Sequence, residues 1–147
     1  MLGEKIKNSC SAYVGKYVDI ELTGWNDGVA DVFILGDDED FYFYQYSYKE
    51  KTIHGLIGKK YITSIELIKT ADDINSKSAD INREFFCKKP VFVEIANKEG
   101  FIKGFFDFRN DNYQNVIIRS FSDTEIQLEY GEKINIVDIC KIEELYE

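Results

Sequence analysis

The chain has 147 residues, a formal net charge of −9 and a sequence pI of about 4.7. Hydrophobic residues make up 44% and charged residues 31%, which is typical of a folded protein and excludes a disordered chain. No apolar run approaches the length of a membrane span and the N-terminus lacks a signal-peptide pattern, so we expect a cytoplasmic protein with no membrane partner.

The first part of the chain predicts a helix followed by short strands. Apolar residues recur at helical spacing from Leu2 to Tyr13, and Gly15 is placed to end the helix. Alternating apolar and polar residues, separated by turns rich in Asn, Asp and Gly, then predict strands at 18–22, 29–35, 41–48 and 51–57.

The second part repeats this order. Residues 91–95 (VFVEI) have the same alternation as residues 18–22 (VDIEL), and further strands are expected at 101–108, 115–121 and 124–130. Residues 70–84 read either as a helix that begins with a capping box and ends before Pro90, or as a polar linker. We favour the helix.

Both parts end with isoleucines three residues apart. The first set is Ile62, Ile65 and Ile68, and the second set is Ile136, Ile139 and Ile142. This spacing fits neither a straight strand nor an α-helix, whereas a strand interrupted by one turn of 3₁₀ helix produces it.

This order of elements resembles the Sm-like and SH3-like small β-barrels, which combine a short helix, a bent five-stranded meander and a 3₁₀ turn before the last strand. The resemblance implies a mainly β protein with short helices. It implies two tandem five-stranded barrel-like units, each preceded by a helix, over residues 1–69 and 70–147. In overall character the acidic, aromatic-rich chain is also similar to bacterial immunity proteins.

Residues for catalysis or metal binding are few. His54 is the single histidine and lies in an apolar-alternating run, and the three cysteines form no zinc pattern. The acidic run Asp37–Asp40 lacks the spacing of a calcium loop. We therefore expect no enzyme activity, no metal and no cofactor, although a hydrolase that uses scattered carboxylates stays open.

The segment from Phe41 to Tyr48 is the most informative candidate for binding. As one strand it places Phe41 and Phe43 on one face, and on the other face Tyr42, Tyr44, Tyr46 and Tyr48. We predict an outward tyrosine face beside Asp37, Asp38, Glu39 and Asp40, because tyrosines are common interface anchors and carboxylates steer cationic partners. Alternatively, the tyrosines pack between the two units.

Other candidate contacts lie in turns. Trp25 in the first hairpin turn is either a binding anchor or a lid on its own barrel, and Asp111, Asp123 and Glu125 add negative charge to the second unit. The sequence thus favours a non-enzymatic immunity or antitoxin protein that neutralises a basic toxin domain, and we expect that domain to be a nuclease. The alternative is an Sm-like nucleic-acid or translation-linked module that uses Lys49, Lys51, Lys59 and Lys60.

Overall fold

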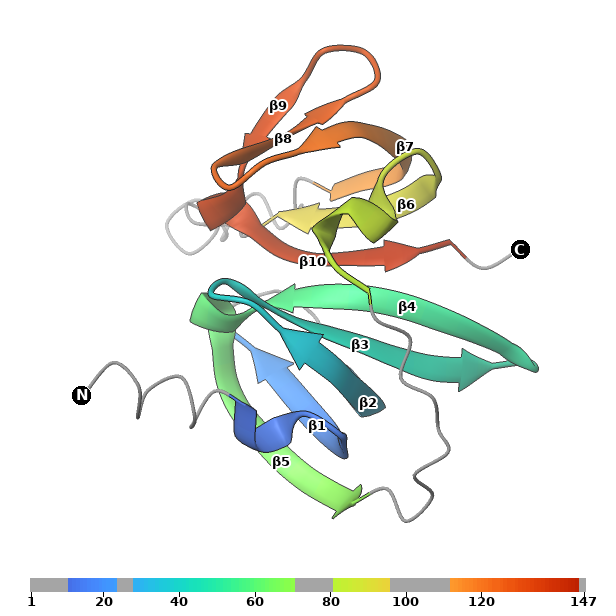
Figure 1. Cartoon of the computed structure of the whole chain (residues 1–147), viewed down its shortest axis with the longest axis vertical. Coiled ribbons are helices and arrows are strands. Elements are labelled where there is room, and N and C mark those ends of the chain that lie inside the picture. Colours follow the sequence, from blue (N-terminus) through green and yellow to red (C-terminus); the bar gives the residue numbers. More distant parts are fainter. Residues whose placement is uncertain (1–10, 24–27, 71–80, 96–111, 146–147) are drawn as a thin grey trace, which may run out of the picture.

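The computed structural model describes residues 11–23, 28–70, 81–95 and 112–145, and these residues form a mainly β structure, as predicted (Figure 1). Five strands come from the first half: β1 (Lys16–Leu22), β2 (Val29–Asp37), β3 (Phe41–Tyr48), β4 (Lys51–Gly58) and β5 (Ile62–Thr70). Five come from the second half: β6 (Pro90–Ile95), β7 (Asn112–Phe121), β8 (Glu125–Leu128), β9 (Lys133–Asn135) and β10 (Ile139–Glu144).

All ten strands belong to one open antiparallel sheet with the order β5-β1-β2-β3-β4-β10-β6-β7-β8-β9. The order within the first half, β5-β1-β2-β3-β4, recurs in the second half as β10-β6-β7-β8-β9. Each half therefore pairs its last strand with its first, and the β4–β10 pair joins the two halves (Figure 1). The prediction of two separate barrels is replaced by this continuous sheet, and the division at residues 69 and 70 stays a prediction.

The expected helices are not found in the described residues. Helical structure there is limited to four 3₁₀ helices: η1 (Ser11–Tyr13), η2 (Lys59–Tyr61), η3 (Arg83–Phe86) and η4 (Ile136–Asp138). Most of the helix predicted up to Tyr13 and most of the helix predicted over 70–84 lie outside the described residues. The strand expected at 101–108 also lies outside them, and the partner of β6 in the sheet is β7.

The predicted 3₁₀ turn before the last strand is confirmed in both halves. η2 precedes β5 and η4 precedes β10. Counted from the ends of these turns, Ile62 corresponds to Ile139 and Ile65 corresponds to Ile142. The isoleucine sets chosen from the sequence were therefore one period out of register, because a three-residue repeat looks the same after a shift of three.

Two clusters of buried side chains stabilise the sheet. One, which we call the first-half cluster, contains apolar residues of β1 and β2, such as Val18 and Ile34, together with Tyr42, Tyr44 and Cys140. The other contains apolar residues of β6 to β10 and takes in three residues from the first half, which are Phe41, Phe43 and Leu56. Side chains of β3 thus point into both clusters, so β3 is buried on both faces over Phe41–Tyr44.

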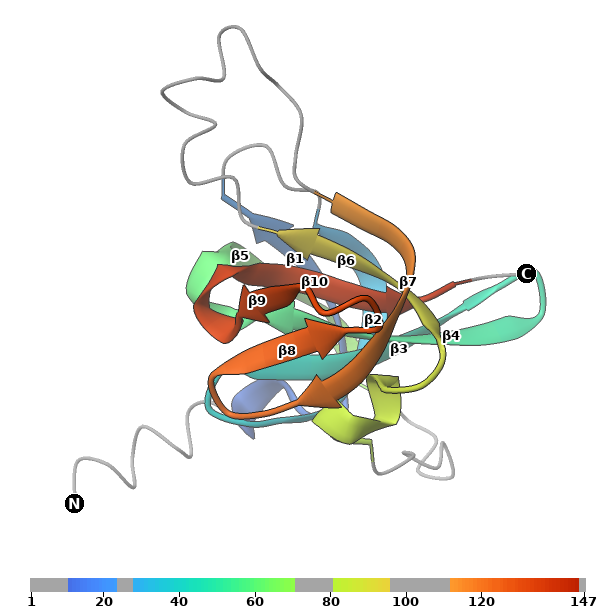
Figure 2. The ribbon, with the colours of Figure 1, turned by 90° about the horizontal axis from the view of Figure 1, so that it is seen from above.

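The strand pattern follows the sequence most directly at β1. Val18, Ile20 and Leu22 are buried, whereas the intervening Asp19 and Glu21 are not, as alternation along a strand requires. The β3–β4 hairpin projects on the side where β10 ends (Figure 2). Among the described residues, no helix has the length and apolar character needed to cross a membrane.

Candidate partner-binding surface

The prediction that four tyrosines of β3 point outward is wrong for the first two of them. Tyr42 and Tyr44 are buried in the first-half cluster, Tyr46 is half-buried, and only Tyr48 is well exposed, at 46%. The alternation between faces was correct, but the second half of the chain covers the phenylalanine face. Both faces of this strand are therefore interior over its first four residues.

The tyrosine hydroxyls bind a carboxylate on the neighbouring half of the sheet. Tyr44 donates a hydrogen bond to Glu143 at 2.5 Å, and Tyr46 donates to the same side chain at 3.0 Å. Burial and the Glu143 carboxylate raise the pKa of Tyr44 and that of Tyr46. A Cβ on Gly55 would lie 2.5 Å from the Tyr44 ring and 2.8 Å from Glu143 Cγ, so this glycine leaves the space for the contact.

The acidic turn between β2 and β3 is also used inside the molecule. Arg83 donates to Asp38 at 2.7 Å and to Asp40 at 2.8 Å, and Lys59 pairs with Asp37 at 2.7 Å. Partial burial acts to raise the pKa of Asp38, but hydrogen bonds from Arg83 and from the turn's backbone N–H groups hold it below its usual value. Of the four predicted contact residues, only Glu39 is exposed.

The remaining predicted contacts are dispersed. Trp25 and Asp111 lie outside the described residues. Asp123 is exposed in the β7–β8 turn, and Glu125 is half-buried with its carboxylate 3.9 Å from Lys133 Nζ. The structure therefore does not gather the predicted residues into one surface.

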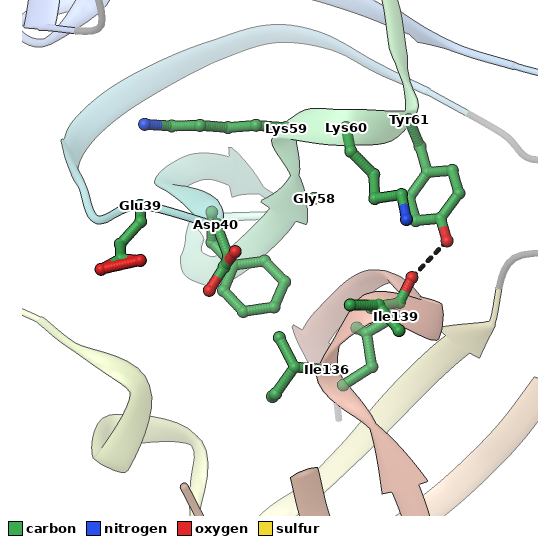
Figure 3. A pocket seen from close by; sticks show the side chains of 10 residues that line it. Glu39, Asp40, Gly58, Lys59, Lys60, Tyr61, Ile136 and Ile139 are labelled. Carbon is green, nitrogen blue, oxygen red and sulfur yellow. Dashed lines mark hydrogen bonds between the residues drawn. The ribbon is translucent and has the colours of Figure 1, made fainter. Parts of the chain in front are cut away.

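A hollow of about 250 Å³ lies where η2 meets η4. Figure 3 shows Glu39 and Asp40 on one side of this hollow and Lys60 and Tyr61 on the other, with Ile136 and Ile139 beneath. The Tyr61 hydroxyl donates to the backbone carbonyl of Val137 and so ties the two turns together. Because the turns join the two halves of the sheet, this hollow is part of their junction.

The residue types common in metal sites do not gather in the described part of the chain. No group of three or more His, Cys, Asp or Glu residues there could hold a metal ion. His54 contacts Glu144 at 2.9 Å and the ring of Phe85. Burial, together with the nearby Glu94 charge, raises the pKa of the Cys140 thiol to about 12, so this thiol is a poor nucleophile at neutral pH.

Sequence reasoning missed a second group of carboxylates, on the outer face of β1 and its neighbours. Asp19 of β1 stands directly opposite Glu66 of β5, and Glu21 follows two residues along the same face. Asp31 of β2 is exposed, and its backbone N–H donates to Asp19 at 2.7 Å. We call these four residues, Asp19, Glu21, Asp31 and Glu66, the acidic face.

The acidic face borders a hollow of about 300 Å³ with aromatic and polar walls. Tyr17 and Phe33 pack with their ring centroids 5.0 Å apart, and Gln45, Ser47 and Thr52 supply polar groups. Lys69 Nζ lies 4.8 Å from the centroid of the Tyr17 ring, so this ring already binds one cation. The alternation in residues 18–22 could have revealed Asp19 and Glu21, but their meeting with Glu66 depends on a strand more than forty residues away.

Comparison with known proteins gave no relative. No protein-family model, curated protein or solved structure matches this chain.

Proposed function

We propose that this chain is a non-enzymatic inhibitor, of the immunity or antitoxin type, that binds a basic toxin domain in the cytoplasm. The observation that carries the proposal is the acidic face, where Asp19 and Glu66 are direct cross-strand neighbours. Like charges in this position destabilise a sheet, so a cationic partner that neutralises them gains that energy on binding.

The surroundings of the acidic face support a protein partner in particular. No basic side chain of the described residues pairs with any of its four carboxylates. The adjoining hollow, which Tyr17 and Phe33 help to line, offers aromatic surface on which an Arg or Lys side chain can stack. Nuclease toxins fit this description, since they carry basic surfaces to hold phosphates.

The proposal is tested with a set of purified basic nuclease domains, inactivated by mutation, whose binding kinetics are measured at low and high salt. The variant Asp19→Asn, Glu21→Gln, Glu66→Gln removes three charges from the acidic face. The matched control Glu39→Gln, Asp123→Asn, Glu132→Gln removes three exposed charges elsewhere. We expect the association rate to fall by about tenfold in the first variant and by less than about twofold in the control.

Two outcomes would contradict the proposal. Equal effects of the two variants would assign the attraction to net charge alone. Binding to none of the basic domains, with the unmodified chain folded, would exclude an inhibitor of this class.

We also propose that the continuous sheet consists of two tandem units of the Sm-like or SH3-like kind. The recurrence of one strand order, with a 3₁₀ turn before each last strand, supports this interpretation. Such units often bind nucleic acid. Here, however, Lys59 is paired with Asp37, and it follows the end of β4 that is far from the turn containing Lys49 and Lys51. A gel shift with RNA and DNA at moderate salt tests this alternative function, and the absence of any shift would remove it.

A further inference from the structure

β5 is an edge strand with unusual exposure of large apolar side chains. It stands at one end of the strand order, and no strand of the described residues pairs with its outer side. It is nine residues long, and the side chains of Leu67 and Ile68 are 50% and 45% exposed. Natural edge strands are usually short, charged or covered, because an open edge invites another strand to pair with it.

The corresponding strand in the second half is covered. β10 also follows a 3₁₀ turn and pairs with the first strand of its half, but its outer side pairs with β4 through Lys141, Ile142 and Glu143. The same position in the sheet thus occurs twice in one chain. It carries an additional strand in the second half, whereas in the first half no described strand pairs with it.

The covered position shows what an added strand contributes. Counted from the preceding 3₁₀ turns, Glu66 corresponds to Glu143. The Glu143 carboxylate accepts hydrogen bonds from Tyr44 and Tyr46 of the covering β3–β4 hairpin. Glu66 has Asp19 as its cross-strand neighbour instead, and a strand added to β5 could bring a donor to this carboxylate as the β3–β4 hairpin does to Glu143.

The two sides of β5 differ in chemistry. Ile65 stands opposite Ile20 and packs against the first-half cluster, and Leu67 stands opposite Val18 but is 50% exposed. Glu66 stands opposite Asp19 on the other side of the sheet. A strand added here would therefore place apolar residues beside Ile65 and Leu67 and basic residues beside Glu66.

We propose that β5 is the docking edge for an extended strand of the basic partner, in which apolar residues alternate with Lys or Arg. This inference rests on the proposed function and names the way in which the partner is bound. The added strand runs antiparallel to β5, as β4 does to β10. The register of β5 on β1 shifts beyond Leu67 and again between Ser64 and Ile62, so the regular ladder offered to the partner covers Ser64–Leu67.

A second copy of the chain is a poorer occupant. The counterpart of β4 in the second half is β9, which has three residues where β4 has eight. Its Lys133 and Asn135 side chains are exposed, and short polar strands of this kind are typical of protected edges.

The test uses an end-capped peptide of about eight residues that alternates Lys and Val, a length typical of a strand. Its affinity for the full chain is measured by isothermal titration calorimetry, beside a Glu-Val peptide and two Lys-Val peptides that are N-methylated at all Lys or at all Val positions. We expect the Lys-Val peptide to bind and the Glu-Val peptide not to bind. One of the two N-methylated peptides should lose binding, namely the one whose blocked N–H groups would donate to β5.

Two protein variants locate the site. Glu66→Lys should lower the affinity of the chain for the Lys-Val peptide by more than about tenfold. The matched charge reversal Glu132→Lys beside β9 should change this affinity by less than about twofold. Equal effects of the two reversals, unchanged binding of both N-methylated peptides, or no binding of the Lys-Val peptide at all would overturn the inference.

The inference and the proposed function can fail separately. Leu67→Asn with Ile68→Asn alters the edge and leaves the charges of the acidic face intact. If a basic toxin domain binds this variant as tightly as the unmodified chain, docking on β5 is wrong and the proposed function stands. Dimers that sediment at twice the chain mass and disappear in this variant would instead assign the edge to a second copy.

Discussion

β5 and β10 occupy the same place in the two halves of the sheet, and their surroundings differ in one respect. β4 covers the outer side of β10, whereas no described strand covers β5. Ile142 of β10 has no exposed surface, while its counterpart Ile65 is partly exposed and Leu67 is half-exposed. Similar sequences thus become an interior strand or an edge depending on what lies beside them.

The comparison also explains where the polar groups of the molecule are used. At the covered strand, Glu143 and Glu144 accept hydrogen bonds from Tyr44, Tyr46 and His54. Arg83 joins the acidic turn of the first half to the second half. Several polar groups noticed in the sequence thus hold the two halves together, whereas the carboxylates of the acidic face stand beside β5, which no described strand covers.

The largest expected effect separates the two positions directly. Ile142→Ala should lower the free energy of unfolding by about 3 kcal/mol, because it leaves a cavity in a fully buried cluster. Ile65→Ala should lower the free energy of unfolding by only about 1 kcal/mol, because that side chain is partly exposed already. Urea unfolding measures both values, and equal costs would mean that β5 is covered in solution as β10 is.

Acid should weaken the connection between the halves. Asp38 has a pKa below its unfolded value, so it contributes stability above about pH 4, and this contribution is lost as the pH falls through its folded pKa. Arg83→Met should lower the free energy of unfolding by about 1.5 kcal/mol at neutral pH and flatten its decline in acid.

Arg119→Met is the control for this effect, because Arg119 is exposed on β7 and carries the same charge. Urea unfolding is measured between neutral and acid pH for both variants. An equally steep acid decline in Arg83→Met and in the unmodified chain would show that the Asp38 contact does not carry the pH dependence.

The smallest expected effect concerns two corresponding hairpins. The β3–β4 turn places Lys49 and Glu50 at positive φ, whereas the β8–β9 turn uses Gly131 there. Lys49→Asn with Glu50→Gly should raise the free energy of unfolding by about 1 kcal/mol, since these residues suit the two-residue turn. Gly131→Ala should lower it by a similar amount, about 1 kcal/mol, and thermal unfolding of both variants checks the pair.

Local patterns predicted the strands and the turns well. The alternation of residues 18–22, the tyrosine-rich strand and the 3₁₀ turns all follow from chain-local sterics and periodicity. A local pattern states that a strand has two faces, but it does not state what covers each face. The tyrosine face was therefore assigned to solvent, although Phe41 and Phe43 on the opposite face are covered by residues from the second half.

The candidate site was less predictable for the same reason. Asp38 and Asp40 resemble a solvated turn until Arg83, more than forty positions away, is known to lie beside them. Asp19 and Glu66 resemble ordinary surface residues until the register of β1 on β5 puts them opposite each other. In both cases the decisive contact is a long-range one that no window of the sequence contains.

The sharing of Phe41, Phe43 and Leu56 between the halves has a consequence for biosynthesis. These three side chains belong to a cluster that is completed by residues from Phe86 to Ile142. During translation the first half emerges with these apolar groups uncovered, and they stay so until the last strand leaves the ribosome. We therefore expect production of this protein to benefit from rapid completion of the chain or from chaperones that shield the first half in the meantime.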